Sequence, residues 1–162
     1  MKWVMMAIFL VIVQFTAHET VMNTNNQEFA YQRIVDAMQF ATQDAVEQVE
    51  PTSVANGEPI FDTEAADAVF RGDLAKNLQL DPITLSPQPN TILKDTPVIL
   101  KEQFIDWSNA TFPYNYTDPS GFNVTLTEPS IVYEVQFTIP SLTSNVQPFT
   151  ITIPVVQSYD GD

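Results

Sequence analysis

Hydrophobic residues are concentrated at the N-terminal end of the chain. Lys2 is followed by an unbroken apolar run from Trp3 to Val13, and the sequence Gln14-Phe-Thr-Ala17 extends it a little further. A helix rises about 1.5 Å per residue, so residues 1–17 cover roughly 25 Å. Because a bilayer core is about 30 Å thick, this length fits either a membrane helix or the hydrophobic region of a signal peptide.

The sequence after the apolar run favours a segment that stays attached. Phe15-Thr16-Ala17 puts a large aromatic residue where a signal peptidase needs a small one, and no cysteine follows that could carry a lipid. We therefore expect an uncleaved anchor or filament helix, with a removed signal peptide and a buried soluble helix as the alternatives. The residues expected to form this membrane or assembly helix are Trp3, Val4, Met5, Met6, Ile8, Phe9, Leu10, Val11, Ile12, Val13 and Phe15.

A second helical pattern follows a polar stretch at residues 18–28. It is an amphipathic stripe with small residues, which would allow close approach to a partner, and it ends at Pro51. No glycine or proline occurs before Pro51, so one helix from about residue 3 to 49 and two separate helices are both compatible with the pattern. The predicted packing stripe consists of Phe29, Ile34, Met38, Ala41, Ala45 and Val49.

The remaining pattern predicts one more helix and then strands. Apolar residues repeat every four positions between Thr63 and Leu80, with Asp62 or Thr63 as the N-cap and Asp81-Pro82 as the stop. Period-two alternation then predicts strands. The expected strands are 98–107 (with Val98, Leu100, Glu102 and Phe104 on one face), 123–127, 131–139 (with Ile131, Tyr133, Val135, Phe137 and Ile139 inward) and 149–155.

The order of helices followed by antiparallel strands predicts an α+β fold, with the helices packed on one face of the sheet. We expect three parts: a membrane or filament-core segment at 1–17, an amphipathic helical extension at 18–50, and an exported α+β head at 51–162.

Composition restricts the possible partners. The chain has 162 residues, a net charge of −14 and no lysine or arginine after Lys101. Such a surface repels nucleic acid, so we expect no polynucleotide partner. Lys2 precedes the apolar run and Glu19 follows it, so the positive-inside rule predicts that the C-terminal part is exported. The absence of cysteine excludes disulfides, cysteine-zinc sites and thiol catalysis.

The sequence offers no constellation of catalytic residues. His18 is the sole histidine and lies just after the apolar run, with no evident nucleophile near it. There is no calcium-loop spacing and no glycine-rich phosphate loop, so we expect no cofactor, no metal and no enzymatic activity.

Two features of the turn-rich segment 108–121 and its flank leave alternatives open. Phe112, Tyr114, Tyr116 and Phe122 could form a binding loop or could fold onto their own sheet. Asn109, Asn115 and Asn123 each begin an Asn-x-Thr sequon. They are glycosylation candidates, although a chain rich in Asn and Thr also yields sequons by chance.

The layout of a short basic tip, an apolar helix, an amphipathic extension and an acidic β-rich head resembles the type IV pilin superfamily. It is particularly similar to the small pseudopilin-like proteins of tight-adherence systems. Ala55-Asn-Gly57 and the segment Phe70–Asp81 also resemble uncharacterised membrane-anchored proteins of Gram-positive, Bacillus-like bacteria. The chain departs from pilins in one respect: no glycine precedes the apolar run, so the processing site is missing, and Glu19 follows the run.

This resemblance implies a non-enzymatic subunit of a surface filament or secretion-type assembly. Its apolar helices would bundle with those of other copies, and its heads would lie outside the cell membrane. The alternatives are a monomeric, anchored or secreted binding module and a secreted enzyme or its accessory factor.

Overall fold

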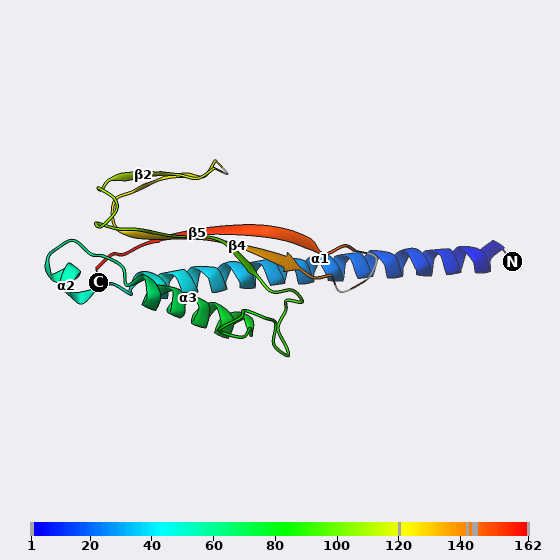
Figure 1. The fold of residues 1–162 in the computed structure, drawn as a ribbon. Coiled ribbons are helices and arrows are strands. Elements are labelled where there is room, and N and C mark those ends of the chain that lie inside the picture. The colour runs from blue at the N-terminus through cyan, green and yellow to red at the C-terminus, as the bar shows by residue number, and fades with distance from the viewer. Residues whose placement is uncertain (1, 120, 142, 144–145, 162) are drawn as a thin grey trace.

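The structure, a computed structural model, describes residues 2–119, 121–141, 143 and 146–161. Its elements follow the chain in the order α1 Lys2–Val46, α2 Pro51–Ala55, α3 Thr63–Leu78, β1 Val98–Ile105, β2 Tyr114–Thr117, β3 Asn123–Leu126, β4 Ser130–Ile139 and β5 Phe149–Ser158. Figure 1 shows three layers: α1 and α3 below, the sheet of β1, β4 and β5 above them, and the β2–β3 hairpin on the far side of that sheet. The predicted α+β class is confirmed.

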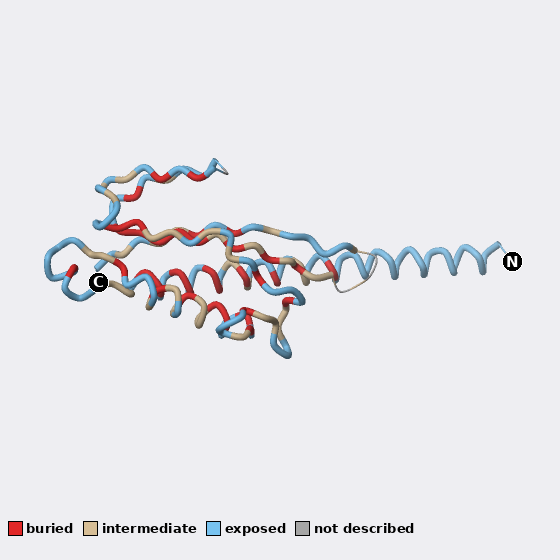
Figure 2. Tube along the Cα trace, viewed as in Figure 1, coloured by how far each residue is buried: buried red, intermediate tan, exposed pale blue. Residues whose placement is uncertain are grey.

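Helix α1 resolves the choice between one helix and two, because it is a single helix of 45 residues. The polar stretch 18–28 continues it without interruption. The hydroxyls of Thr16, Thr20 and Thr24 donate to the carbonyls one turn earlier, at 2.9–3.0 Å, so they do not compete for the helical N–H groups. Only the C-terminal half of α1 packs against the head, and the N-terminal half projects beyond it (Figure 2).

The core lies between the two helices and the inner face of the sheet. The central strand β4 buries Ile131, Tyr133, Val135, Phe137 and Ile139 on that face, as the alternation predicted. Opposite them lie Ile34, Met38 and Ala41 of α1, together with Ala66, Phe70 and Leu74 of α3.

The register of the sheet corrects the predicted face of β1. Strands β1 and β4 are antiparallel, with Ile99 opposite Val135 and Phe104 opposite Ile131, but the register shifts between Ile99 and Lys101. Leu100 is the extra residue of a β-bulge, which reverses the alternation at that point. Val98 and Leu100 are therefore each 50% exposed and do not share the inner face with Phe104.

Helix α3 begins where the sequence predicted and ends two residues earlier. The Asp62 carboxylate accepts a hydrogen bond from the Ala65 N–H at 3.0 Å, so Asp62 is the N-cap. At the other end Gln79 adopts a left-handed conformation, with φ 57° and ψ 58°, which stops the helix before Leu80.

The β2–β3 hairpin was predicted only in part, because β2 lies in the segment interpreted as turns. Tyr116 and Leu126 of the hairpin pack on Ile105 and Val132, which point away from the helices. The Lys101 ammonium forms a salt bridge with Asp118 and donates to the Tyr116 hydroxyl at 3.0 Å. A cation on β1 thus holds the hairpin against the outer face of the sheet.

Candidate functional site

The N-terminal part of α1 is the largest apolar surface that the head leaves uncovered. Every residue from Lys2 to Met22 is exposed, and the eleven large apolar side chains from Trp3 to Phe15 are 47–83% exposed. Keeping such side chains in water instead of an apolar phase costs about 2 kcal/mol each, or roughly 20 kcal/mol in total. A penalty of that size exceeds the usual stability of a small domain.

Two of the polar side chains in this segment are compatible with an apolar environment. The Thr16 and Thr20 hydroxyls are satisfied by backbone carbonyls of the same helix, so they need no water. Residues 2–22 cover about 30 Å at 1.5 Å per residue, which matches a bilayer core. By length and composition α1 is therefore able to cross a membrane.

The exposed face of the anchor segment continues along the head as one line of side chains. We define the outer seam as a line of positions on α1 that are spaced alternately four and three residues apart. The alternation is broken once, because Phe29 is four residues from both of its neighbours in the line. The outer seam comprises Val4, Ile8, Val11, Phe15, His18, Met22, Asn25, Phe29, Arg33, Asp36 and Phe40. Phe29 and Phe40 are each 60% exposed although they lie beside the folded head.

The outer seam also carries two opposite charges between Phe29 and Phe40. Arg33 donates from its guanidinium to the Asn77 carbonyl at 3.1 Å, at the C-terminal end of α3. Asp36 lies one turn further along α1 and is exposed. The seam therefore combines large apolar groups with one cation and one anion, a pattern that a second helix can match.

The predicted packing stripe lies on the other side of α1 and faces its own head. Ile34, Met38, Ala41 and Ala45 are buried against α3 and the sheet, and Val49 is half-buried just past the helix end. Phe29 is a correction, because Ala30 takes its place in the core. A shift of one residue turns a side chain by about 100° around a helix, which moves Phe29 to the outer seam. The stripe fixes the head to α1 and is not available to a partner.

The aromatic residues proposed as a binding loop pack mainly within the hairpin. Tyr116 is buried, and Phe112 and Tyr114 are half-buried against Tyr116 and its neighbours. Phe122 is 37% exposed and meets the Tyr116 ring edge-on, with centroids 6.4 Å apart. The loop therefore folds onto its own sheet.

The three sequon asparagines occupy different environments. Asn109 uses its side-chain amide in both directions, because it accepts from the Asp106 N–H at 3.1 Å and donates to the Phe104 carbonyl at 3.0 Å. Asn115 and Asn123 are exposed on the outer face of the hairpin, where Asn115 accepts from the Thr125 hydroxyl at 2.9 Å. Asn109 is thus a structural residue of the turn after β1.

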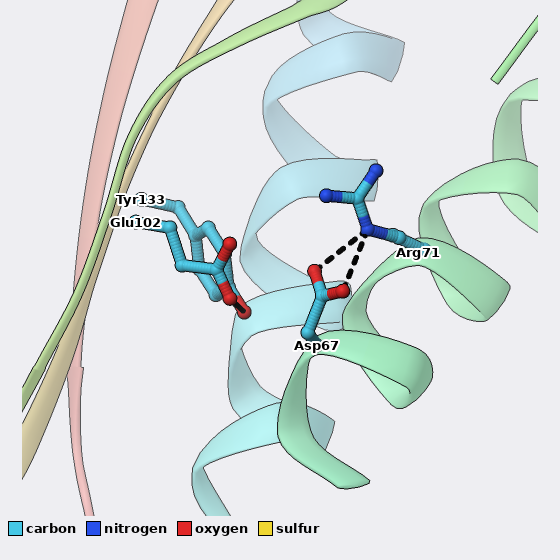
Figure 3. A network of polar contacts seen from close by, with 4 residues as sticks. All are labelled: Asp67, Arg71, Glu102 and Tyr133. Carbon is cyan, nitrogen blue, oxygen red and sulfur yellow. Dashed lines mark hydrogen bonds and ion pairs between the residues drawn. The ribbon is translucent and has the colours of Figure 1, made fainter. Parts of the chain in front are cut away.

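A polar network between α3 and the sheet is the remaining concentration of ionisable groups (Figure 3). Arg71 contacts both carboxylate oxygens of Asp67, at 2.7 and 2.8 Å, and the Tyr133 hydroxyl donates to Glu102 at 3.5 Å. Burial, followed by the charge of Asp67, raises the pKa of Glu102. Burial and the nearby Glu102 raise the pKa of the Tyr133 hydroxyl as well. The network contains no serine, threonine or histidine.

His18 lies far from this network, on the bare surface of α1 beside Val11, Gln14 and Phe15. Among the described residues, no group of three or more His, Asp or Glu side chains is placed to hold a metal ion. The features that sequence reasoning missed are Met22 and Phe40 of the outer seam. Their signal is their spacing from Phe29: Met22 lies seven residues before it and Phe40 eleven residues after it, which correspond to about two and about three helical turns.

Comparison with known proteins adds no assignment, because no protein-family model, no curated protein and no solved structure matches this chain.

Proposed function

We propose that this chain is a non-enzymatic, membrane-anchored, exported protein that assembles with further copies through α1, as a pilin-like subunit of a surface filament or secretion-type assembly. The observation that carries the proposal is the outer seam, which extends from the exposed anchor segment onto the head. An anchor alone would need apolar residues only within the bilayer.

The outer seam is longer than a bilayer requires, so contact with lipid accounts for only part of it. Residues 2–22 are enough to cross a bilayer. Phe29 and Phe40 lie beyond that length and about 16 Å apart along the helix axis, where lipid tails do not reach. Two phenylalanines that are each 60% exposed on a helix of a folded head are best explained by contact with another protein surface.

A second copy of α1 suits this surface because steps of four and three residues form the seam of a left-handed helix pair. A parallel neighbour shifted along the axis by about one turn would bring its Asp36 next to Arg33, so the charges of the seam complement one another. The same shift keeps apolar positions opposite one another from Val4 to Phe15 and brings His18 beside Phe15 and Met22.

The sheet edges offer a poorer route to assembly. Pro154 lies within β5 opposite Glu134 and supplies no N–H group. Strand β1 carries the bulge at Leu100. Prolines and bulges are common devices against edge-to-edge strand pairing, so we infer assembly by helices.

Cysteine cross-linking tests the proposal, because the chain contains no cysteine of its own. We expect Asp36→Cys and Phe40→Cys to form disulfide-linked dimers upon oxidation in membranes, since the exposed seam faces a neighbour. Thr125→Cys, on the outer face of the hairpin, is the matched exposed control and should remain monomeric.

Ile8→Glu provides the second arm of the test, because it places a charge within the membrane part of the seam. In the double variant Ile8→Glu/Phe40→Cys, we expect the disulfide-linked dimer to be lost while the head stays folded. If seam and hairpin cysteines cross-link equally, or if neither does while the protein remains in the membrane, the self-assembly proposal is wrong and a monomeric anchored binding module takes its place.

A further inference from the structure

The end of the head farthest from the N-terminus carries a groove that the assembly surface does not use. Figure 1 shows the C-terminal end of the chain and α2 at this end, opposite the projecting part of α1. The groove has a volume of about 290 Å³, and its walls include Pro59, Trp107, Glu128, Pro129, Tyr159 and Asp160. If α1 is anchored in a membrane, this distal groove lies at the end of the head that points away from the membrane.

Two aromatic rings line the distal groove. Trp107 is 38% exposed and rests edge-on against Phe112, with ring centroids 5.1 Å apart. Tyr159 is half-buried, packs against the main core and donates its N–H to the Pro129 carbonyl at 2.8 Å. Both rings are therefore held from behind, and each leaves part of its surface open.

The turn that carries Trp107 is fixed by a buried carboxylate. Asp106 is 2% exposed and accepts hydrogen bonds from the Phe61 N–H at 3.1 Å and the Ser108 N–H at 2.9 Å. The Asn109 side chain holds the same turn from its other side, since it accepts from the Asp106 N–H. Trp107 thus follows directly after a residue tied to both β1 and the α2–α3 connection, and it is positioned before any ligand arrives.

The charge of the distal groove has one sign. Glu128 and Asp160 are exposed carboxylates, and none of the residues that line the groove is basic. The salt bridges found among the described residues, Asp67–Arg71 and Lys101–Asp118, involve neither of them. An entering cation would meet two carboxylates and no competing ammonium or guanidinium group.

From these observations we propose that the distal groove binds a lysine or arginine side chain on an extended segment of a partner protein. The cation would lie over the open ring of Trp107, the ring type that attracts cations most strongly, and the two carboxylates would complete its coordination. The partly exposed ring of Pro59 suits an extended backbone better than a bulky helix. This inference does not depend on self-assembly.

A fluorescence titration of the full chain in detergent micelles tests the proposal. The chain has two tryptophans, so Trp3→Phe leaves Trp107 as the reporter. The probe is a tetralysine amide, with a tetraglutamate peptide as its charge-reversed counterpart. We expect a saturable change in Trp107 emission with tetralysine, at a dissociation constant of about 1 mM or below, that weakens as salt is added. Tetraglutamate should produce no saturable change.

Charge-neutralising variants locate the binding site. Glu128→Gln and Asp160→Asn should each weaken tetralysine binding by roughly threefold, the scale of a partly exposed ion pair. Asp95→Asn changes the net charge equally but lies in a loop near the membrane-proximal end of the head, so it should bind like the parent. Three outcomes would overturn the proposal: no saturable change at about 10 mM tetralysine, equal responses to both peptides, or equal weakening in Asp95→Asn.

Discussion

Phe70 of α3 stacks face to face on Tyr133 of β4, with ring centroids 3.6 Å apart and ring planes 5° from parallel. Tyr133 also meets Phe104 of β1 edge-on, at a centroid distance of 6.4 Å. Three elements that are far apart in the sequence thus converge on one ring at the centre of the sheet. This contact fixes how α3 sits under the sheet and, through α3, how α1 is held against the head.

Removing the Phe70 ring should destabilise the head strongly. Phe70 is fully buried, so Phe70→Ala removes a stacked aromatic ring and leaves a cavity, at a cost of about 3–5 kcal/mol in the free energy of unfolding. Urea unfolding followed by circular dichroism in detergent measures the loss. Phe40→Ala is the matched control, because Phe40 is 60% exposed and its loss should change stability by less than about 0.5 kcal/mol. Equal losses of stability in the two variants would show that Phe70 is not part of the packed core.

Glu102 should make the head less stable as the pH rises. Its pKa is raised in the folded state, first by burial and then by the charge of Asp67, so the folded protein holds this proton more tightly than the unfolded chain. The resulting stability is fully present below the ordinary glutamate pKa and is lost as the pH rises through the higher folded value. Glu102→Gln keeps an acceptor for the Tyr133 hydroxyl and removes the negative charge. We expect its melting temperature to exceed that of the parent at pH 7 and to match it near pH 3.5.

The control for this prediction is Asp95→Asn, an exposed loop substitution with the same change in charge. Its melting temperature should not rise relative to that of the parent as the pH increases. A Glu102→Gln variant that is less stable than the parent at pH 7 would mean that Arg71, which lowers the pKa of Glu102, outweighs burial and Asp67.

Lys101→Met should release the β2–β3 hairpin while the helices stay in place. The substitution leaves the Asp118 side chain, 8% exposed, without the ammonium group, at a cost of about 3 kcal/mol. Hydrogen exchange should therefore accelerate at residues 114–117 and 123–126 and remain slow in β4 and α3. Lys76→Met, an exposed lysine of α3, is the charge-matched control. Unchanged exchange in the hairpin would indicate that Tyr116 and Leu126 hold it without the salt bridge.

The elements that could be predicted from sequence are those whose pattern repeats within one segment. The alternation from Ile131 to Ile139 predicted the inner face of β4, because successive side chains of a strand point to opposite sides. The four-residue repeat around Phe70, with Asp62 before it, likewise predicted α3 and its N-cap. Each signal is local and independent of the partner that the element meets.

The features that could not be predicted depend on contacts between distant segments. The bulge at Leu100 is defined by pairing with β4, so the sequence of β1 alone indicates an uninterrupted alternation. Strand β2 is only four residues long, lies in a segment rich in turn-forming residues, and is stabilised by β3 and Lys101. The head covers the side of α1 that carries Ala30 and leaves Phe29 exposed. The apolar pattern of α1 alone allows either residue to face inward.

Gln79→Gly should stabilise the head, because the helix α3 ends on a residue in a left-handed conformation. Gln79 has φ 57° and ψ 58°, a region where a side chain clashes with its own backbone and glycine does not. Its N–H donates to the Ala75 carbonyl and its carbonyl accepts from Gln88, and both bonds persist without a side chain. The greater freedom of glycine in the unfolded chain offsets part of the relieved strain. We expect a net gain of about 0.5–1 kcal/mol in the free energy of unfolding, which corresponds to about 3 °C in melting temperature. Gln79→Ala should bring no gain, since alanine keeps the β-carbon that causes the strain. Similar melting temperatures for the two variants would mean that the left-handed turn at Gln79 stores little strain.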